Sequence, residues 1–97
     1  MTHEEPMANS EQVIVEFFGI PRQRAGRAEL AVPAGTVADV LAAVERACPG
    51  LAGLVRQDGG LPPHYLLSLG GERFVRDLHE PVPAGGHLLL LSADAGG

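Results

Sequence analysis

The stretch Gly35-Thr36-Val37-Ala38-Asp39-Val40-Leu41, within GTVADVLAAVERACPG at residues 35–50, contains the clearest helix signal of the chain. Thr36 is a favourable N-cap residue, and Asp39 three positions later completes a short capping box. Because a single apolar stripe cannot be buried alone, we expect this helix to pack against a sheet. Pro49-Gly50 ends the helix. The stripe falls at helical spacing and consists of Val37, Val40, Leu41, Val44 and Cys48.

Two strands are predicted before this helix. Residues 12–18 (QVIVEFF) are rich in β-branched and aromatic residues and alternate between two faces. Residues 28–32 (AELAV) predict a second strand, with Leu30 and Val32 on one face. Residues 19–26 contain Pro21 and two glycines and are expected to form a loop. The close spacing predicts an antiparallel hairpin.

Three more strands are predicted after the helix. Residues 65–69 precede Gly70-Gly71, which has the chemistry of a two-residue hairpin turn, and residues 72–75 return as a short strand. Residues 76–86 hold two prolines and two glycines and are expected to be mostly loop. The last strand, residues 87–91, has four consecutive leucines. A leucine run without alternation indicates a strand covered on both faces, and therefore central in the sheet.

Composition excludes several classes of function. The 97 residues, 45% hydrophobic and 20% charged, suit one globular domain with a modest core. A net charge of −5 argues against nucleic acid and suits a partner with a basic docking surface. The apolar runs are too short for a membrane span, and the start of the chain lacks a signal-peptide pattern. We therefore expect a cytoplasmic protein with no membrane partner.

Reactive side chains are few. Cys48 is the single cysteine, which excludes an internal disulfide and a CxxC-type metal or redox site. The four histidines lack ligand spacing, so no metal site is predicted. All seven basic residues are arginines. Without a lysine side chain, the chain cannot form lysine-linked polymers of itself.

The predicted order is strand, strand, long helix, strand, short strand, strand. A helix that crosses from a hairpin to a final central strand parallel to the first describes the β-grasp arrangement. The predicted fold class is therefore α+β, a ubiquitin-like mixed sheet of four to five strands with one main helix packed across it. Residues 1–11 would be a flexible leader, 12–91 the β-grasp domain, and 92–97 an extended Gly-Gly tail.

From Val13 to Gly97 the chain resembles the MoaD/ThiS family of ubiquitin-like sulfur carriers. It departs from the family's pattern at Gly70-Gly71, where Asn-Gly is frequent, at Gly86, where an acidic residue is usual, and at Ser92-Ala93, which replace prolines before the tail. The resemblance rests on Phe17-Phe18, Ala25-Gly26, the helix start at 35–41, Pro49-Gly50-Leu51, Pro83-Ala84-Gly85-Gly86 and the terminal Gly96-Gly97.

This resemblance implies that Gly97 carries the reacting group. An ATP-dependent activating enzyme, an adenylyltransferase of the MoeB/ThiF type, would adenylate the Gly97 carboxylate. A sulfur donor would then displace AMP and leave a thiocarboxylate. A sulfur-accepting enzyme, such as the large subunit of molybdopterin synthase, would consume it. The chain would bind no cofactor, since ATP belongs to the activating enzyme, and would be a protein co-substrate rather than an enzyme on its own.

Two regions are predicted to contact these partners. Gly96 would give the tail the backbone freedom to slide into a narrow active site, and Ser92, Ala93, Asp94 and Ala95 would lie beside the reacting group. The strands could also present an apolar sheet face for docking. The residues proposed for that face are Phe17, Phe18, Leu67 and Leu69, each of which could instead be a plain core residue.

Several roles remain open at this point. The acceptor pathway could be that of molybdopterin, thiamin, cysteine or a thio-metabolite. A narrower alternative is the small subunit of molybdopterin synthase, in which case the chain would be part of an enzyme. A ubiquitin-like modifier conjugated to target lysines would use the same tail. A plain β-grasp binding module would not need the tail at all.

Overall fold

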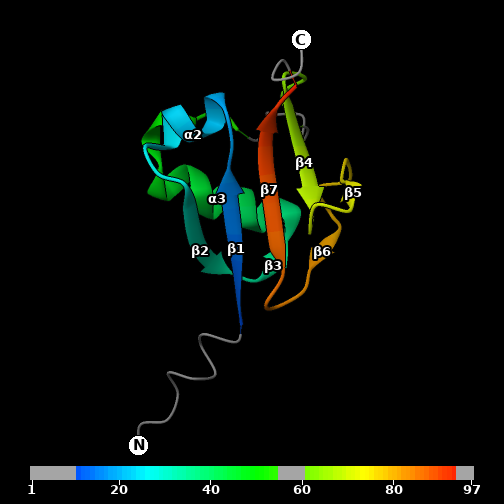
Figure 1. The fold of residues 1–97 in the computed structure, drawn as a ribbon. Helices are drawn as coiled ribbons and strands as arrows, with labels where there is room; N and C mark the ends of the chain where they lie inside the picture. The colour runs from blue at the N-terminus through cyan, green and yellow to red at the C-terminus, as the bar shows by residue number, and fades with distance from the viewer. Residues whose placement is uncertain (1–10, 55–60, 94–97) are drawn as a thin grey trace, which may run out of the picture.

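The protein's structure is a computed structural model that describes residues 11–54 and 61–93. A five-stranded mixed sheet has the strand order β2-β1-β7-β4-β5, and helix α3 lies across one of its faces (Figure 1). This arrangement confirms the predicted β-grasp fold. The five strands are β1 (Gln12–Phe17), β2 (Glu29–Pro33), β4 (Tyr65–Leu69), β5 (Arg73–Phe74) and β7 (His87–Ser92).

The two ends of the described chain pair at the centre of the sheet. Strands β1 and β7 run parallel, with Val15 opposite Leu88 and Phe17 opposite Leu90. All four side chains are at most 1% exposed and belong to the hydrophobic core. Strand β2 pairs antiparallel with the outer side of β1, and β4 pairs antiparallel with β7. The central position predicted for the leucine-rich strand is therefore confirmed.

Helix α3 (Val37–Ala47) forms as the sequence predicts. Asp39 N donates to Thr36 Oγ1 at 3.1 Å, and Thr36 N donates to Asp39 Oδ2 at 3.1 Å, so the capping box is complete. The predicted stripe faces the sheet and is buried, including Cys48 at 2% exposure. A short 3-10 helix, η1 (Pro49–Leu51), follows where the prolyl-glycine pair stops α3.

A helix stands where residues 19–26 were predicted to form a loop. Helix α2 (Ile20–Ala25) begins with Pro21 in its first turn, where the missing N–H costs nothing. Gly26 ends it with a left-handed φ of 74°, and its N–H donates to the carbonyl of Arg22 at 3.0 Å. The loop prediction was wrong because proline and glycine, which are frequent in loops, also occur at the first and last positions of short helices.

Smaller differences concern the second half of the chain. Leu69 pairs with Arg73, so the turn after β4 has three residues rather than the two expected. Strand β5 is correspondingly shorter than predicted. Within the expected loop, β6 (Pro81–Val82) pairs with β3 (Gly35–Thr36) in a second, two-stranded sheet. The Arg73–Glu80 ion pair connects β5 to the residue before β6, and its hydrogen bond and charge raise the pKa of Arg73.

The prediction that β7 is covered on both faces was wrong. Leu88 and Leu90 are fully buried against the core, but Leu89 and Leu91 on the opposite face are only half-buried. Because α3 covers a single face, the described chain offers nothing of comparable size to cover the other (Figure 1). Four successive leucines therefore leave one apolar face of the sheet partly open to water.

Gly50 lies where η1 meets α2, and we expect any larger residue at this position to lower the stability of the fold. A Cβ added at this glycine would collide with the carbonyl oxygen of Arg24, which is backbone and cannot swing aside. Gly50→Ala should therefore lower the free energy of unfolding by roughly 2–4 kcal/mol, as overpacking and strain do. Chemical denaturation measures this loss.

Gly26→Ala is the matched control for this substitution. Its added Cβ meets nothing within 4 Å, so only the left-handed φ of 74° opposes it, at a cost of about 1 kcal/mol. If both variants lose the same free energy of unfolding, the close approach of η1 to α2 is not the reason that position 50 needs glycine.

Candidate functional site

The register of the strands decides which side chains share the uncovered face. Phe17 lies opposite Leu90, and the next residue, Phe18, continues the ladder by donating its N–H to the Leu90 carbonyl at 3.0 Å. Leu91 lies opposite Leu66. Because side chains alternate along a strand, Phe18, Leu91 and Leu66 form one apolar row across β1, β7 and β4, at the end of β7 that leads toward the tail.

A second row crosses the same face one step further from the tail. Leu89 lies opposite Ser68, and Ser68 lies opposite Phe74. Phe74 is 62% exposed and Phe18 is 41% exposed. We call these apolar residues the outer patch, and they are Phe18, Leu66, Phe74, Leu89 and Leu91.

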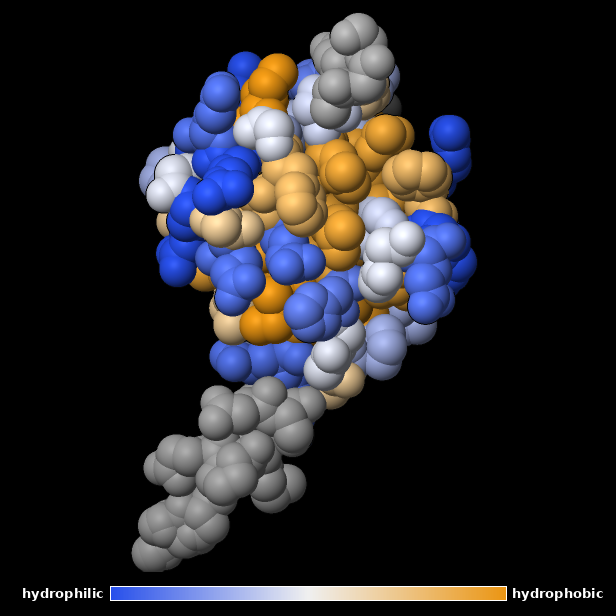
Figure 2. Space-filling view, viewed as in Figure 1, coloured by the Kyte–Doolittle hydropathy of each residue, from blue (hydrophilic) through white to orange (hydrophobic). Residues whose placement is uncertain are grey.

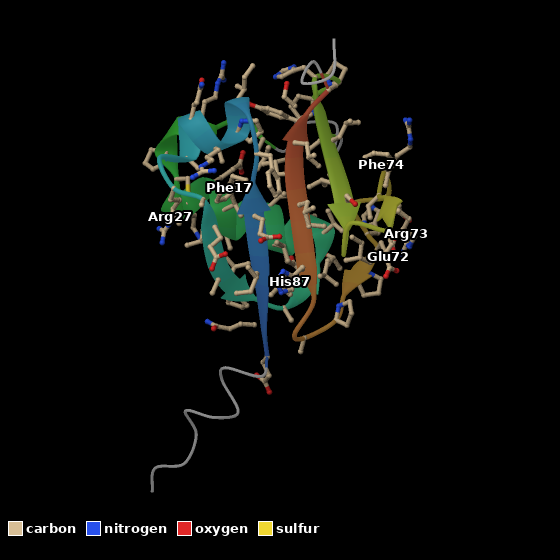
Figure 3. All side chains as sticks on the ribbon, viewed as in Figure 1. Phe17, Arg27, Glu72, Arg73, Phe74 and His87 are labelled. Carbon is tan, nitrogen blue, oxygen red and sulfur yellow. The ribbon has the colours of Figure 1, made fainter. Side chains whose placement is uncertain are left out.

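The outer patch is visible from the side opposite α3. Figure 2 shows apolar side chains gathered over β7 and β4 toward the C-terminal end of β7, with polar side chains below and to either side. Figure 3 places Phe74 at the margin of this face, and His87 at the opposite end of β7. Large contiguous apolar surfaces rimmed by polar residues mark protein, membrane or ligand contact sites, so the outer patch is a candidate interaction site.

Most of the side chains predicted for the docking face lie on the opposite one. Phe17 and Leu67 are each 1% exposed, and Leu69 packs against the core cluster. Only Phe18 belongs to the outer patch. The predicted sheet face was therefore the wrong one for three of four residues, because alternate positions on a strand point to opposite sides.

The strand that leads to the tail is longer than predicted. Ser92 lies in β7 opposite Tyr65 and is 6% exposed, and the Ala93 N–H donates to the His64 carbonyl at 2.7 Å. Both residues were expected to belong to the tail. Asp94, Ala95, Gly96 and Gly97 lie outside the described residues, so their roles stay predictions. From Ala93, four further residues reach at most ~14 Å if extended.

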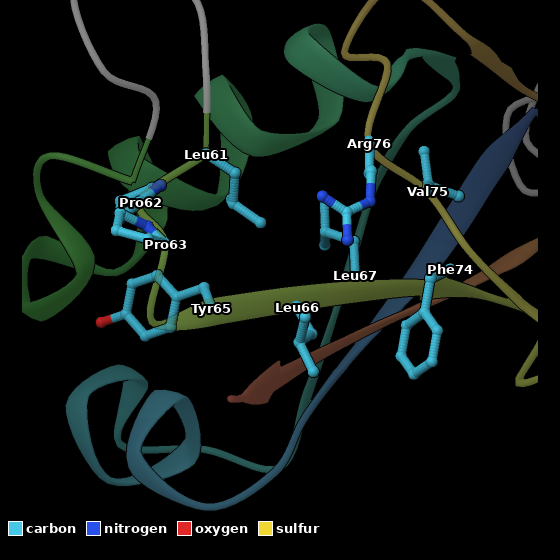
Figure 4. Close-up of a pocket in the computed structure, with 9 residues that line it drawn as sticks. All are labelled: Leu61, Pro62, Pro63, Tyr65, Leu66, Leu67, Phe74, Val75 and Arg76. Atoms are coloured by element: carbon cyan, nitrogen blue, oxygen red, sulfur yellow. The ribbon is translucent and has the colours of Figure 1, made fainter. Parts of the chain in front are cut away.

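A groove adjoins the outer patch between the first residues of β4, the segment before it and the end of β5 (Figure 4). Its volume is about 470 Å³, its walls are mostly apolar, and Leu66 and Phe74 belong to both surfaces. Sequence reasoning missed it because its walls come from segments that meet only after folding. The lining residues are Leu61, Pro62, Pro63, Tyr65, Leu66, Leu67, Phe74, Val75 and Arg76.

The part of the chain that the structure describes offers little chemistry of its own. Across residues 11–54 and 61–93, no three His, Cys, Asp or Glu side chains gather so that they could hold a metal ion. Cys48 is buried. None of the helices within these residues has the length and apolar character needed to cross a membrane. The features that remain are a surface, formed by the outer patch and groove, and the strand β7, which ends at Ser92, five residues before Gly97 in the sequence.

Solved structures of other proteins share this fold. SAMP1 from Haloferax volcanii matches with a TM-score of 0.75 and 29% identity, over 89% of this chain and 99% of that one. CysO, in the BexX/CysO complex from Amycolatopsis orientalis, gives 0.74 and 24%, over 88% and 99%. A proposed molybdopterin converting factor subunit 1 from Pyrococcus furiosus gives 0.65 and 19%, over 86% and 98%.

These structural neighbours are ubiquitin-like sulfur carriers or modifiers of the MoaD/ThiS type, so the resemblance drawn from the sequence is confirmed. The match to SAMP1, at 29% identity, indicates a ubiquitin-like protein of this kind. The two with identities of 24% and 19% support the fold alone. No protein-family model matches the chain, and no curated protein matches its sequence significantly.

Substitutions of the adjacent residues Phe17 and Phe18 test which residues point into the core and which point to the uncovered face of the sheet. Phe17→Ala removes a ring from the core, where the side chain is 1% exposed, and should cost roughly 3–5 kcal/mol of unfolding free energy. Phe18→Ala truncates a ring that is 41% exposed, and should cost less than about 1 kcal/mol. Urea denaturation followed by circular dichroism gives both values. Equal losses would contradict the assigned register.

Proposed function

We propose that this chain is a sulfur carrier whose reacting group is the C-terminal carboxylate of Gly97. An activating enzyme of the MoeB/ThiF type adenylates the carboxylate, and a sulfur donor converts it to a thiocarboxylate. That thiocarboxylate then donates sulfur to a biosynthetic enzyme. The observation that carries the proposal is a β-grasp body whose central strand, β7, ends beside an uncovered apolar patch, in a chain whose sequence ends in Gly-Gly.

Activation is needed because a free carboxylate is a poor acyl donor: it is resonance-stabilised and repels nucleophiles. Attack of a Gly97 oxygen on the α-phosphate of ATP forms the acyl adenylate and releases pyrophosphate. With sulfide as the donor, HS⁻ attacks the carbonyl carbon, so that a C–S bond forms, the C–O bond to AMP breaks and AMP leaves, and loss of the S–H proton gives the thiocarboxylate. Every acid, base and metal ion for these steps belongs to the partner enzyme, and this chain supplies the acyl group.

The body of the carrier has to hold the tail at a partner's active site. The outer patch lies on β1, β4 and β7, and its Phe18–Leu91–Leu66 row is at the end of β7 that leads to the tail. From Leu91 to Gly97 the chain can span at most ~20 Å. A partner that covers the outer patch can therefore receive the carboxylate while the folded body stays outside its active site.

The neighbours support different acceptors. CysO occurs in a complex with BexX, and the Pyrococcus protein is named for molybdopterin conversion. We propose a partner enzyme of this general kind for the present chain, in a molybdopterin, thiamin, cysteine or thio-metabolite pathway. If the acceptor is the large subunit of molybdopterin synthase, this chain is the small subunit of that enzyme.

A second candidate function is that of a protein modifier. SAMP1, at 29% identity, is named a small archaeal modifier protein. An activated Gly97 could acylate lysines of target proteins instead of accepting sulfur. Because the chain contains no lysine, each modified target lysine would carry one copy rather than a lysine-linked chain of this protein. Immunoblots of cell extract would then show discrete heavier bands, and a single low-mass species would contradict this role.

Mass spectrometry tests the carrier directly. Incubation of the intact chain with the MoeB/ThiF-type enzyme of the same genome, ATP and sulfide should raise its mass by ~16 Da, because sulfur replaces one oxygen at Gly97. A variant extended by one alanine after Gly97 should show no shift, since its glycine carboxyl is in a peptide bond. A wild-type chain whose mass is unchanged would overturn the sulfur-carrier proposal.

The outer patch is tested by the kinetics of activation. Phe18→Ala should raise the KM for the chain about 10-fold or more in a pyrophosphate-release assay, with kcat nearly unchanged, since aromatic anchors dominate docking. Arg46→Ala is the control, because Arg46 is exposed on α3 behind the sheet. Equal KM values for the wild type and Phe18→Ala would show that the activating enzyme docks elsewhere.

A further inference from the structure

Two glutamates occupy directly opposite positions on neighbouring strands beside the outer patch. Glu16 on β1 lies directly opposite Glu29 on β2, and it is also opposite Leu89 of the outer patch on its other side. Side chains opposite one another on adjacent strands point to the same face. The row therefore runs Glu29, Glu16, Leu89, Ser68, Phe74, acidic at one end and apolar at the other.

Two cationic groups lie near this pair, and neither makes a hydrogen bond to its carboxylates. His87 Nδ1 lies 3.7 Å from Glu16 Oε1, which is an ion pair when the imidazole is protonated but is longer than a hydrogen bond. Arg27 donates through Nε to the backbone carbonyl of Glu29 at 3.0 Å, not to its carboxylate. Within residues 11–54 and 61–93, no ion pair joins either carboxylate to an arginine.

Like charges placed directly opposite on a sheet oppose folding. We therefore expect the Glu16–Glu29 pair to be unfavourable in the isolated chain. It lies next to half-buried leucines, whose partial exposure to water is also unfavourable. One covering surface could relieve both: apolar over the outer patch, and cationic where it meets the two carboxylates.

We infer that the partner which covers the outer patch carries arginine or lysine side chains opposite Glu16 and Glu29, and that these two glutamates determine which enzymes the carrier accepts. The inference rests on the proposed function and names the chemistry of its partner. The net charge of −5 supports the same choice, because it draws the chain toward a basic surface from a distance. A partner with an acidic rim is repelled.

Activation kinetics with the MoeB/ThiF-type enzyme of the same genome test the inference. The double variant Glu16→Gln/Glu29→Gln should raise the KM for the chain about 5- to 30-fold with little change in kcat, and the wild-type KM should rise more steeply with salt than that of the variant. The matched control is Glu11→Gln/Glu45→Gln, which removes the same charge at positions outside this row, Glu45 being on α3 behind the sheet, and should leave KM within about 2-fold.

The outcomes separate the two proposals. Equal KM values and salt slopes for the two double variants overturn the inference but leave the carrier function in place. Absence of any adenylation of the wild type overturns the carrier function and, with it, this choice of partner.

A measurement on the chain alone tests the premise. Removing one charge, by Glu16→Gln or Glu29→Gln, should raise Tm by roughly 1–6 °C, because it relieves the cross-strand repulsion. Glu72→Gln should move Tm by less. If either substitution in the pair lowers Tm, the carboxylates stabilise the isolated sheet and the argument for a cationic partner fails whatever the function.

Discussion

The parallel pairing of β1 with β7 is the contact on which the rest of the molecule depends. It joins residues from opposite ends of the chain, with Val15 opposite Leu88 and Phe17 opposite Leu90, and a parallel connection requires a crossover. Helix α3 covers the face on which these four side chains lie. The same pairing fixes the other face, because once Phe17 and Leu90 point inward, Phe18 and Leu91 must point outward beside one another. Core and outer patch are thus two consequences of one register.

Features with local signals could be predicted from the sequence. The Thr36–Asp39 capping box and the apolar stripe after it determine α3 almost by themselves, and alternation determines β1. Helix α2 also has local signals, Pro21 at its start and Gly26 at its end, but six residues are too short for an apolar period to distinguish a helix from a loop. The β3–β6 pairing could not be predicted, since two-residue strands exist only through partners more than forty residues away.

Of the candidate site, the sequence predicts the Gly-Gly tail and the existence of an apolar sheet face, but not the residues that form that face. That an apolar sheet face exists follows from QVIVEFF and the four leucines, but which alternate residues form it depends on where the helix packs, and a shift of one position exchanges the faces. Phe17 and Phe18 illustrate this, as adjacent residues of one type that are 1% and 41% exposed. The groove beside Phe74 could not be predicted from the sequence, because its walls come from segments that meet only in the folded chain. The roles of Gly96 and Gly97 follow from the family resemblance and remain predictions.

The uncovered face explains why β7 contains four leucines in a row. Leu88 and Leu90 suffice for the core, so Leu89 and Leu91 add no packing against α3, and their exposed area weakens the isolated chain through lost hydrophobic transfer. Strands that only close a core carry polar residues at such positions. Beside Leu89, the sheet adds a second unfavourable feature in the paired carboxylates of Glu16 and Glu29. The partly exposed leucines and the opposed glutamates both lower the stability of the isolated chain and lie side by side on one face. A single partner that covers this face would explain both features.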